Sequence, residues 1–271
     1  MNANDKEARV LFDHYNCKGV PHLLFIDKNG NEVDRIIGYM PPAEYLIRVK
    51  DITNNKYTLS DYLTQYNSGI SNTELIAEIA MKYEQRGDSD NAKEFYSILI
   101  KEYPDSESEY YQKATYYIAA NAFKNGIQMA LKAYINSFPN SPLIKDAYFT
   151  MINFYADKDL KKEELEIYSE MIKRFSEDAN VLNSYSWRMT ELDENLNDAL
   201  NKIKKAVLLT SKNPLKQANL IDTEAEVLWK LNRLDEAIKA IERAISIDSK
   251  NKYFQDQKNK FLNSIRLKQS T

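Results

Sequence analysis

A pattern of small and apolar residues recurs about every 34 residues between Thr73 and Asp248, and this period limits the fold more than any other feature of the chain. The clearest copy spans residues 73–104 and contains two stretches with helical apolar spacing, separated by Gly87 and ended by Pro104. Its predicted inward positions are Ile76, Ile79, Ala80 and Tyr83 in the first stretch and Ala92, Tyr96 and Leu99 in the second. A helix pair of this size cannot bury its apolar face alone, so the pattern predicts copies that stack on one another.

Further copies keep the same phase along the chain. Residues 108–139, 145–175 and 180–210 match the pattern more loosely, and residues 218–248 match it clearly. Alanines at the predicted crossing points let helix backbones approach closely, while aromatic residues fill the wider gaps. Residues 251–268 form a basic, amphipathic stretch, which we expect to be a helix that covers the last apolar face.

This pattern resembles the tetratricopeptide repeat, and nearly every signature class is present in the first copy. The resemblance implies about five repeats over residues 72–249, closed by a capping helix at residues 250–271. It also implies a concave groove, lined by the first helix of each repeat, that binds a protein or peptide partner. The residues that the repeat phase places toward this groove, or alternatively in the packing between repeats, are Met81, Tyr116, Asn153, Arg188 and Trp229.

Residues 15–39, with the sequence YNCKGVPHLLFIDKNGNEVDRIIGY, do not follow the helical pattern. The continuous apolar run at residues 23–26 predicts a strand buried on both faces. Asn29-Gly30 predicts a hairpin turn, and residues 32–39 supply the antiparallel partner. A helix is predicted before the loop, at residues 4–15, and Pro41-Pro42 opens another one after the hairpin.

This order of helix, loop, strand, turn, strand and helix resembles the C-terminal part of the thioredoxin fold. The resemblance implies a cis peptide bond between Val20 and Pro21, in a loop whose backbone pairs with an extended peptide. It makes Val20, Pro21 and His22 the candidate peptide-binding residues, although His22 departs from the threonine that is usual in the family. The alternative role of Pro21 is to shape the entry into the first strand.

The family carries a Cys-x-x-Cys redox pair upstream of this region, whereas Cys17 is the single cysteine of this chain. Cys17 is either a redox-sensitive thiol or a small buried apolar residue. Because a two-stranded hairpin alone is marginal in water, we expect residues 1–54 to be a partial thioredoxin-like domain and Met1 to be a start inside a longer coding sequence. In a less favoured interpretation, the hairpin docks on the helical region or on a second copy of the chain.

Residues 55–71 are predicted to be a connecting helix and linker. Ser71 and Glu74 have the spacing of a capping box, so the next helix is expected to begin at Ser71. In the hairpin, Asp27, Glu32 and Asp34 are interpreted as solvated turn and edge residues.

Composition and charge exclude several functional classes. The formal net charge of −3 argues against a nucleic-acid surface as the main function. Cys17, His14 and His22 do not have metal-ligand spacing, so we expect no metal site, and we expect no cofactor. The sequence contains no run of about 18 apolar residues, so no membrane span is expected.

The sequence therefore predicts a mostly α fold, with a truncated thioredoxin-like α/β segment followed by a tetratricopeptide α-solenoid. As given, the chain is interpreted as a protein–protein interaction scaffold without redox activity. The alternative is a fragment of a full-length thioredoxin-like thiol–disulfide oxidoreductase whose cysteine pair lies upstream of Met1. The polar start MNANDKEARV is not a signal peptide, which is typical of a cytoplasmic chain, whereas a longer parent with a signal peptide would be periplasmic. No feature of the sequence sets the oligomeric state.

Overall fold

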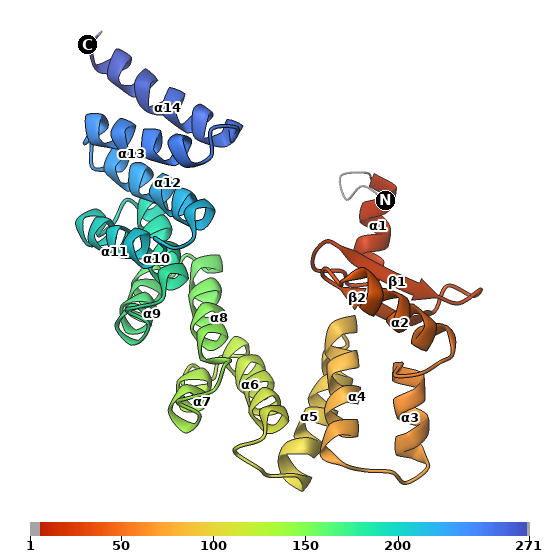
Figure 1. Ribbon diagram of the computed structural model, residues 1–271. Coiled ribbons are helices and arrows are strands. Elements are labelled where there is room, and N and C mark those ends of the chain that lie inside the picture. Colours follow the sequence, from red (N-terminus) through yellow and green to blue (C-terminus); the bar gives the residue numbers. More distant parts are fainter. Residues whose placement is uncertain (1–5, 270–271) are drawn as a thin grey trace. The chain divides into compact units, whose positions relative to one another are not determined.

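The computed structural model describes residues 6–269, which contain fourteen helices and two strands (Figure 1). This composition confirms the predicted fold class, a mostly helical chain with a small α/β segment at its N-terminal end. The chain forms two compact units, Met1–Thr150 and Met151–Thr271, and each is described by itself. None of the helices in the described range is both long and apolar enough to cross a membrane.

The α/β segment opens the first unit and has the predicted order of elements. It consists of α1 (Lys6–His14), β1 (His22–Ile26), β2 (Glu32–Ile37) and α2 (Pro42–Thr53). The strands pair antiparallel with His22 opposite Ile37 and a register shift at Phe25/Ile26. In the turn between them, the Asp27 carboxylate accepts hydrogen bonds from the backbone N–H groups of Asn29 and Asn31, at 2.8 and 2.9 Å. Asp27 is therefore a turn residue, as predicted.

The next three helices carry the first clear repeat. They are α3 (Leu59–Asn67), α4 (Thr73–Arg86) and α5 (Ser89–Glu102). The predicted capping box is wrong, because Asn72 caps α4 and its side chain accepts a hydrogen bond from Leu75 N–H. Ser71 instead hydrogen-bonds the hydroxyl of Tyr103 at 2.7 Å. At the other end, α4 stops at Gly87, which has φ +74° in the left-handed region that favours glycine.

The remaining helices of the first unit continue the repeat pattern with α6 (Glu109–Lys124) and α7 (Ala130–Ser137). Helix α8 (Ile144–Asp157) contains the division between the two units. Five of the predicted inward residues of the first repeat, Ile76, Ile79, Ala80, Tyr96 and Leu99, belong to one buried cluster, and Tyr83 packs partly buried against it. Ala114 of α6 is also part of it, so the core passes from one helix pair into the next.

The second unit consists of consecutive helices only. They are α9 (Lys161–Arg174), α10 (Ala179–Leu192), α11 (Leu196–Leu209), α12 (Pro214–Lys230), α13 (Leu234–Ile247) and α14 (Lys252–Gln269). Small side chains are fully buried where these helices meet, among them Ala199, Ala206, Ala225, Ala237 and Ala244. Phe254 and Phe261 of α14 are buried as well, so α14 covers the face of the last helix pair as the repeat pattern predicts.

Candidate functional site

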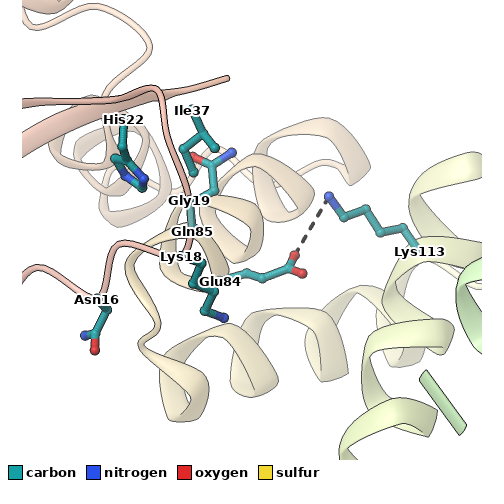
Figure 2. A pocket seen from close by; sticks show the side chains of 8 residues that line it. All are labelled: Asn16, Lys18, Gly19, His22, Ile37, Glu84, Gln85 and Lys113. Carbon is teal, nitrogen blue, oxygen red and sulfur yellow. Dashed lines mark ion pairs between the residues drawn. The ribbon is translucent and has the colours of Figure 1, made fainter. Parts of the chain in front are cut away.

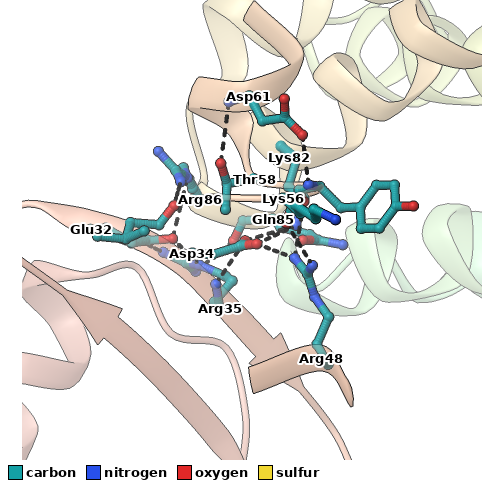
Figure 3. A network of polar contacts seen from close by, with 12 residues as sticks. Glu32, Asp34, Arg35, Arg48, Lys56, Thr58, Asp61, Lys82, Gln85 and Arg86 are labelled. Carbon is teal, nitrogen blue, oxygen red and sulfur yellow. Dashed lines mark hydrogen bonds and ion pairs between the residues drawn. The ribbon is translucent and has the colours of Figure 1, made fainter. Parts of the chain in front are cut away.

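The hairpin of the α/β segment docks on helix α4, and a buried carboxylate lies at the centre of the contact (Figure 3). Asp34 of β2 is fully buried, and its two oxygens lie 2.7 and 2.9 Å from the Nζ atom of Lys82 on α4. Arg48 of α2 donates a further hydrogen bond to Asp34 and contacts the backbone carbonyl of Tyr57 at 3.0 Å. The interpretation of Asp34 as solvated is therefore wrong, because two cations compensate its burial.

Lys82 itself is buried, and its charge depends on the same contact. Desolvation lowers the pKa of Lys82, while the hydrogen bond and charge of Asp34 oppose that shift. Removing Asp34 would leave the buried Lys82 without its counter-charge, whereas removing Lys82 would leave Asp34 with Arg48 alone.

A second group of charges holds the hairpin against the C-terminal end of α4. Arg35 is buried and donates to the carbonyl of Gln85 at 2.6 Å and to the carbonyl of Tyr15 at 2.9 Å. Arg86 donates to the carbonyl of Val33 at 2.8 Å and pairs with Glu32 at 3.2 Å. Gln85 has no intrahelical partner for its carbonyl at this end of α4, so Arg35 satisfies a group that a helix end leaves open. Glu32 is thus also part of the contact and not a solvated edge residue.

The loop before β1 completes the contact. Asn16 donates from Nδ2 to the carbonyl of Arg86 at 3.1 Å. A Cβ atom placed on Gly87 would lie 3.1 Å from the Cβ atom of Asn16, which is tighter than an ordinary van der Waals contact. The absence of a side chain at Gly87 therefore lets the loop approach the end of α4 closely.

Sequence reasoning did not single out these docking residues, although the sequence contains a signal for them. Glu32 and Asp34 are two residues apart, which places them on one face of a strand. Lys82 and Arg86 are four residues apart, which places them on one face of a helix. Each spacing indicates that its two charges share one face, but neither shows which strand and which helix meet.

The candidate peptide-binding loop lies beside this contact. The peptide bond between Val20 and Pro21 is cis, as the resemblance implies, and the side chain of Val20 is 73% exposed. Pro21 is also exposed, and its carbonyl accepts a hydrogen bond from Gly38 N–H at 2.9 Å. Within residues 6–269, the backbone N–H and C=O of Val20 make no backbone hydrogen bond. Both groups are thus available to an extended peptide.

His22 begins β1 and is half-buried. Within the described part of the chain, neither ring nitrogen makes a hydrogen bond of normal geometry, and both nitrogens are shielded from solvent. Desolvation lowers the pKa of His22, Arg35 adds to that shift, and Glu32 and the nearby Gly19 carbonyl oppose it. The imidazole is therefore neutral at pH 7.

A cavity of about 370 Å³ opens next to the loop (Figure 2). It is lined by Asn16, Lys18 and Gly19 of the loop, His22 and Ile37 of the hairpin, Glu84 and Gln85 of α4, and Lys113 of α6. Lys113 reaches toward Glu84 across this space, with 3.8 Å between Nζ and the carboxylate. The same Oε2 atom of Glu84 accepts a hydrogen bond of 2.6 Å from the Tyr96 hydroxyl. The cavity thus joins the loop to two helices of the repeat region.

Cys17 lies on the other side of the loop and is half-buried. It lines a smaller space of about 160 Å³ together with apolar residues of α1 and β1, including Leu11, Phe12 and Leu24. Burial raises the pKa of the Cys17 thiol, with Arg35 lowering it and Glu32 raising it further. A thiol in this state is a weaker nucleophile than a free cysteine, which fits the apolar interpretation of this residue.

The residues predicted to line a concave groove have different surroundings. In the first unit, Met81 packs half-buried against the core of the first repeat, and Tyr116 shares a hydrogen bond of 2.9 Å with the hydroxyl of Thr150. In the second unit, Asn153 is exposed to solvent.

Arg188 and Trp229 also belong to the second unit and contact neighbouring helices. Arg188 donates to Glu164 of α9 at 2.6 Å, and this carboxylate is the main reason why the pKa of Arg188 is raised. The indole of Trp229 donates to Ser264 of α14 at 2.9 Å, and Lys260 lies 4.0 Å from its ring centroid. Trp229 also borders a surface pocket together with Lys230 and Asn232.

Comparison with known proteins gives matches at both ends of the chain. A model of the thioredoxin-like domain family matches residues 2–53, and models of the tetratricopeptide repeat match residues 65–106 and 223–251. The thiol:disulfide interchange protein DsbD of Tatumella citrea is 35% identical over 54 residues, which are 19% of this chain and 9% of that protein. This chain thus matches less than a tenth of that relative's length.

Solved structures of repeat proteins are similar to a large part of the chain. The MamA protein has 17% identity and a TM-score of 0.48, covering 67% of this chain and 94% of that one. YrrB, described as a TPR protein with an unusual peptide-binding site, has 11% identity and a TM-score of 0.47, covering 73% of this chain and 97% of its own. On the evidence of the family models, this chain carries a thioredoxin-like segment at its N-terminal end, followed by tetratricopeptide repeats.

Proposed function

We propose that this chain is a scaffold that binds extended peptide segments of partner proteins at the loop formed by residues 16–22, without thiol–disulfide oxidoreductase activity of its own. The observation that carries the proposal is the exposed Val20–Pro21 segment, in a loop that Asn16 connects to the end of α4 by a hydrogen bond. An extended peptide can add its own N–H and C=O groups to those of Val20, as in other cases of strand addition. Tetratricopeptide repeats are protein interaction modules, which agrees with a partner that is a protein.

The lack of redox activity follows from the cysteine count. A dithiol mechanism forms a mixed disulfide and then resolves it with a second thiol, and Cys17 is the single thiol in this sequence. Its raised pKa further disfavours the thiolate that would attack a disulfide.

Peptide binding can be tested with a phage-displayed library of unstructured twelve-residue peptides, selected against the full chain. Selected peptides should shift the amide NMR signals of Gly19, Val20 and His22, because these residues form the loop. Peptides that shift signals elsewhere only, or a selection that yields no binder, would refute the proposal. In a separate assay, the rate of insulin reduction by dithiothreitol should be the same with and without the chain.

A second candidate function is supported by the similarity to a thiol:disulfide interchange protein. In this second candidate, the chain is part of a longer thioredoxin-like oxidoreductase. A signal peptide on that longer protein would place it in the periplasm. Genomic DNA upstream of Met1 tests it directly. An in-frame Trp-Cys-x-x-Cys about 50 residues upstream would favour this candidate, whereas a stop codon close to Met1 would exclude it.

The repeats are proposed to offer a further contact surface for the partner. Its candidate residues remain Met81, Tyr116, Asn153, Arg188 and Trp229. Among them Trp229 offers the sharpest test, because it borders a pocket and also contacts α14. Trp229→Ala should weaken binding of a partner, and Trp229→Phe, which keeps the ring against α14, should preserve stability. If Trp229→Ala lowers the melting temperature but leaves partner binding unchanged, Trp229 packs against α14 and does not contact the partner.

A further inference from the structure

The cavity beside the loop gives the proposed peptide site a chemical preference. We infer that this cavity, between residues 16–22 and helices α4 and α6, accepts an acidic side chain of the bound peptide. The inference rests on the proposed function, since it concerns a peptide that pairs with Val20. Helices α4 and α6 of the first repeats would then contact a side chain of that peptide directly.

The cavity lies next to the backbone that is proposed to pair with the peptide. Gly19 lines the cavity and directly precedes Val20, whose backbone is open to pairing. A paired strand advances about 3.3 Å per residue, and alternate side chains point to the same side. A side chain one or two residues from the pairing position therefore reaches the cavity. At about 370 Å³, the cavity has room for the side chain of an aspartate or glutamate.

The charges around the cavity favour an anion. Within residues 6–269, Lys18 forms no ion pair. Lys113 pairs with Glu84 at 3.8 Å, a separation at which a partly exposed pair contributes little. The carboxylate of Glu84 is also engaged by the hydroxyl of Tyr96 at 2.6 Å. The cavity lining thus carries two positive charges, on Lys18 and Lys113, and one negative charge, on Glu84. A carboxylate of the bound peptide would balance the remaining positive charge.

His22 adds a neutral polar group to this wall (Figure 2). Both ring nitrogens are shielded from solvent, so His22 borders the cavity without offering a hydrogen bond, and a neutral ring does not repel a carboxylate. A basic ligand side chain would be repelled by Lys18 and Lys113, and an apolar one would leave Lys18 without an opposite charge.

The inference can be tested with blocked seven-residue peptides of valine, alanine and serine that carry glutamate at one position at a time. Each has a counterpart with glutamine at the same position, and dissociation constants are measured by fluorescence anisotropy with the full chain. At one position or more, glutamate should bind about fivefold more tightly than glutamine, as expected for a partly exposed ion pair. The glutamine peptides report backbone pairing alone.

Variants connect this preference to the cavity. Lys18→Gln and Lys113→Gln should each reduce the preference for glutamate, and the double variant should abolish it. Lys124→Gln is the matched control, because Lys124 is exposed at the far end of the same helix α6. A melting temperature for each variant establishes that it is folded.

The possible failures can be told apart. If glutamate and glutamine peptides bind equally at every position, or if Lys124→Gln reduces the preference as much as Lys113→Gln, the acidic pocket is wrong and the proposed peptide site stands. If no peptide of either set binds, the proposed function fails and the inference fails with it.

Discussion

At the scale of single residues, Asp222 is a carboxylate whose burial is poorly compensated. It is almost fully buried on α12, and within the described range its Oδ1 atom has no hydrogen-bond partner. Burial, with the nearby Glu226 charge as a second cause, raises the pKa of Asp222 from 3.8 to about 6. The nearby Tyr253, Lys260 and Gln257 side chains oppose this rise in pKa, but Lys260 forms its hydrogen bonds with Glu226, at 2.7 Å.

This raised pKa predicts a pH-dependent stability. An Asp222 pKa above the unfolded value means that its contribution is fully present below about pH 3.8 and is lost as pH rises through about 6. Asp222→Asn, which cannot ionise, should therefore raise the free energy of unfolding at pH 7.5 by at most about 3 kcal/mol and change it little at pH 4. Urea unfolding at both pH values measures this, with the exposed Asp235→Asn as control. Equal gains at both pH values would contradict the assignment.

Gly87 provides a second prediction at this scale. Gly87→Ala places a Cβ atom 3.1 Å from Asn16 and at φ +74°, so it adds a steric cost to the backbone strain. The control Gly126→Ala has a similar strain at φ +100° but nothing within 4 Å. Gly126→Ala should cost about 1 kcal/mol of stability, and Gly87→Ala about 1–3 kcal/mol more. Adding Asn16→Gly should recover part of the excess, as measured by chemical denaturation. If Asn16→Gly recovers none of this stability, contact with Asn16 is not the cause of the extra cost of Gly87→Ala.

At the scale of elements, the docking of β2 on α4 joins the thioredoxin-like segment to the first repeat. Asp34, Lys82 and Arg48 form the buried part of this contact, whereas Arg9 and Asp13 of α1 form an exposed ion pair at 3.3 Å. The Asp34 group is buried and joins three elements, whereas the Arg9–Asp13 pair is exposed and lies within one helix. We therefore expect the loss of the Asp34 charge to cost far more stability than the loss of the Asp13 charge.

Asp34→Asn should destabilise the chain by about 3–5 kcal/mol, because it leaves Lys82 buried with a weaker partner. Asp13→Asn should cost less than about 1 kcal/mol. Hydrogen exchange should then show faster exchange of the β1 and β2 amides in Asp34→Asn, with α5 unchanged. Loss of protection throughout α5 would show that the contact is needed for folding of the first repeat itself.

The sequence predicts some of these elements and not others, for a physical reason. Helix positions and the left-handed Gly87 follow from local patterns, because apolar periodicity and turn chemistry act over a few residues. The cap of α4 was misplaced by one residue, since Ser71 and Asn72 both suit that position. The partners Asp34 and Lys82 are 48 residues apart, so no local pattern reports their contact. Charged residues in a hairpin normally indicate solvent exposure, and here tertiary packing overrides that rule.

At the scale of the whole molecule, each of the two compact units contains fully buried apolar side chains. Ile76 lies in the core of the first unit and Ile203 in that of the second, and both side chains are fully buried. In repeat arrays, stability is a sum of terms from each repeat and its nearest neighbours. A cavity in one core should therefore affect mainly the unit that contains it.

Ile76→Ala and Ile203→Ala should each cost about 2–5 kcal/mol locally. Hydrogen exchange followed by mass spectrometry should show faster exchange within residues 6–150 for the first variant and within residues 151–269 for the second. Each variant is the control for the other. Equal loss of protection in both units for either variant would show that the chain unfolds as one cooperative body.

The contact between Asp34 and Lys82 has a consequence for how such chains can recombine during evolution. A gene fusion that transferred residues 1–54 alone to another helical array would transfer Asp34 with Arg48 but leave its second cation, Lys82, behind on α4. A transfer that extended to residue 104 would keep the Lys82 and Gly87 positions together with the hairpin. The inheritable module is then larger than the thioredoxin-like segment, and substitutions at residues 34 and 82 should co-vary among descendants of a common fusion.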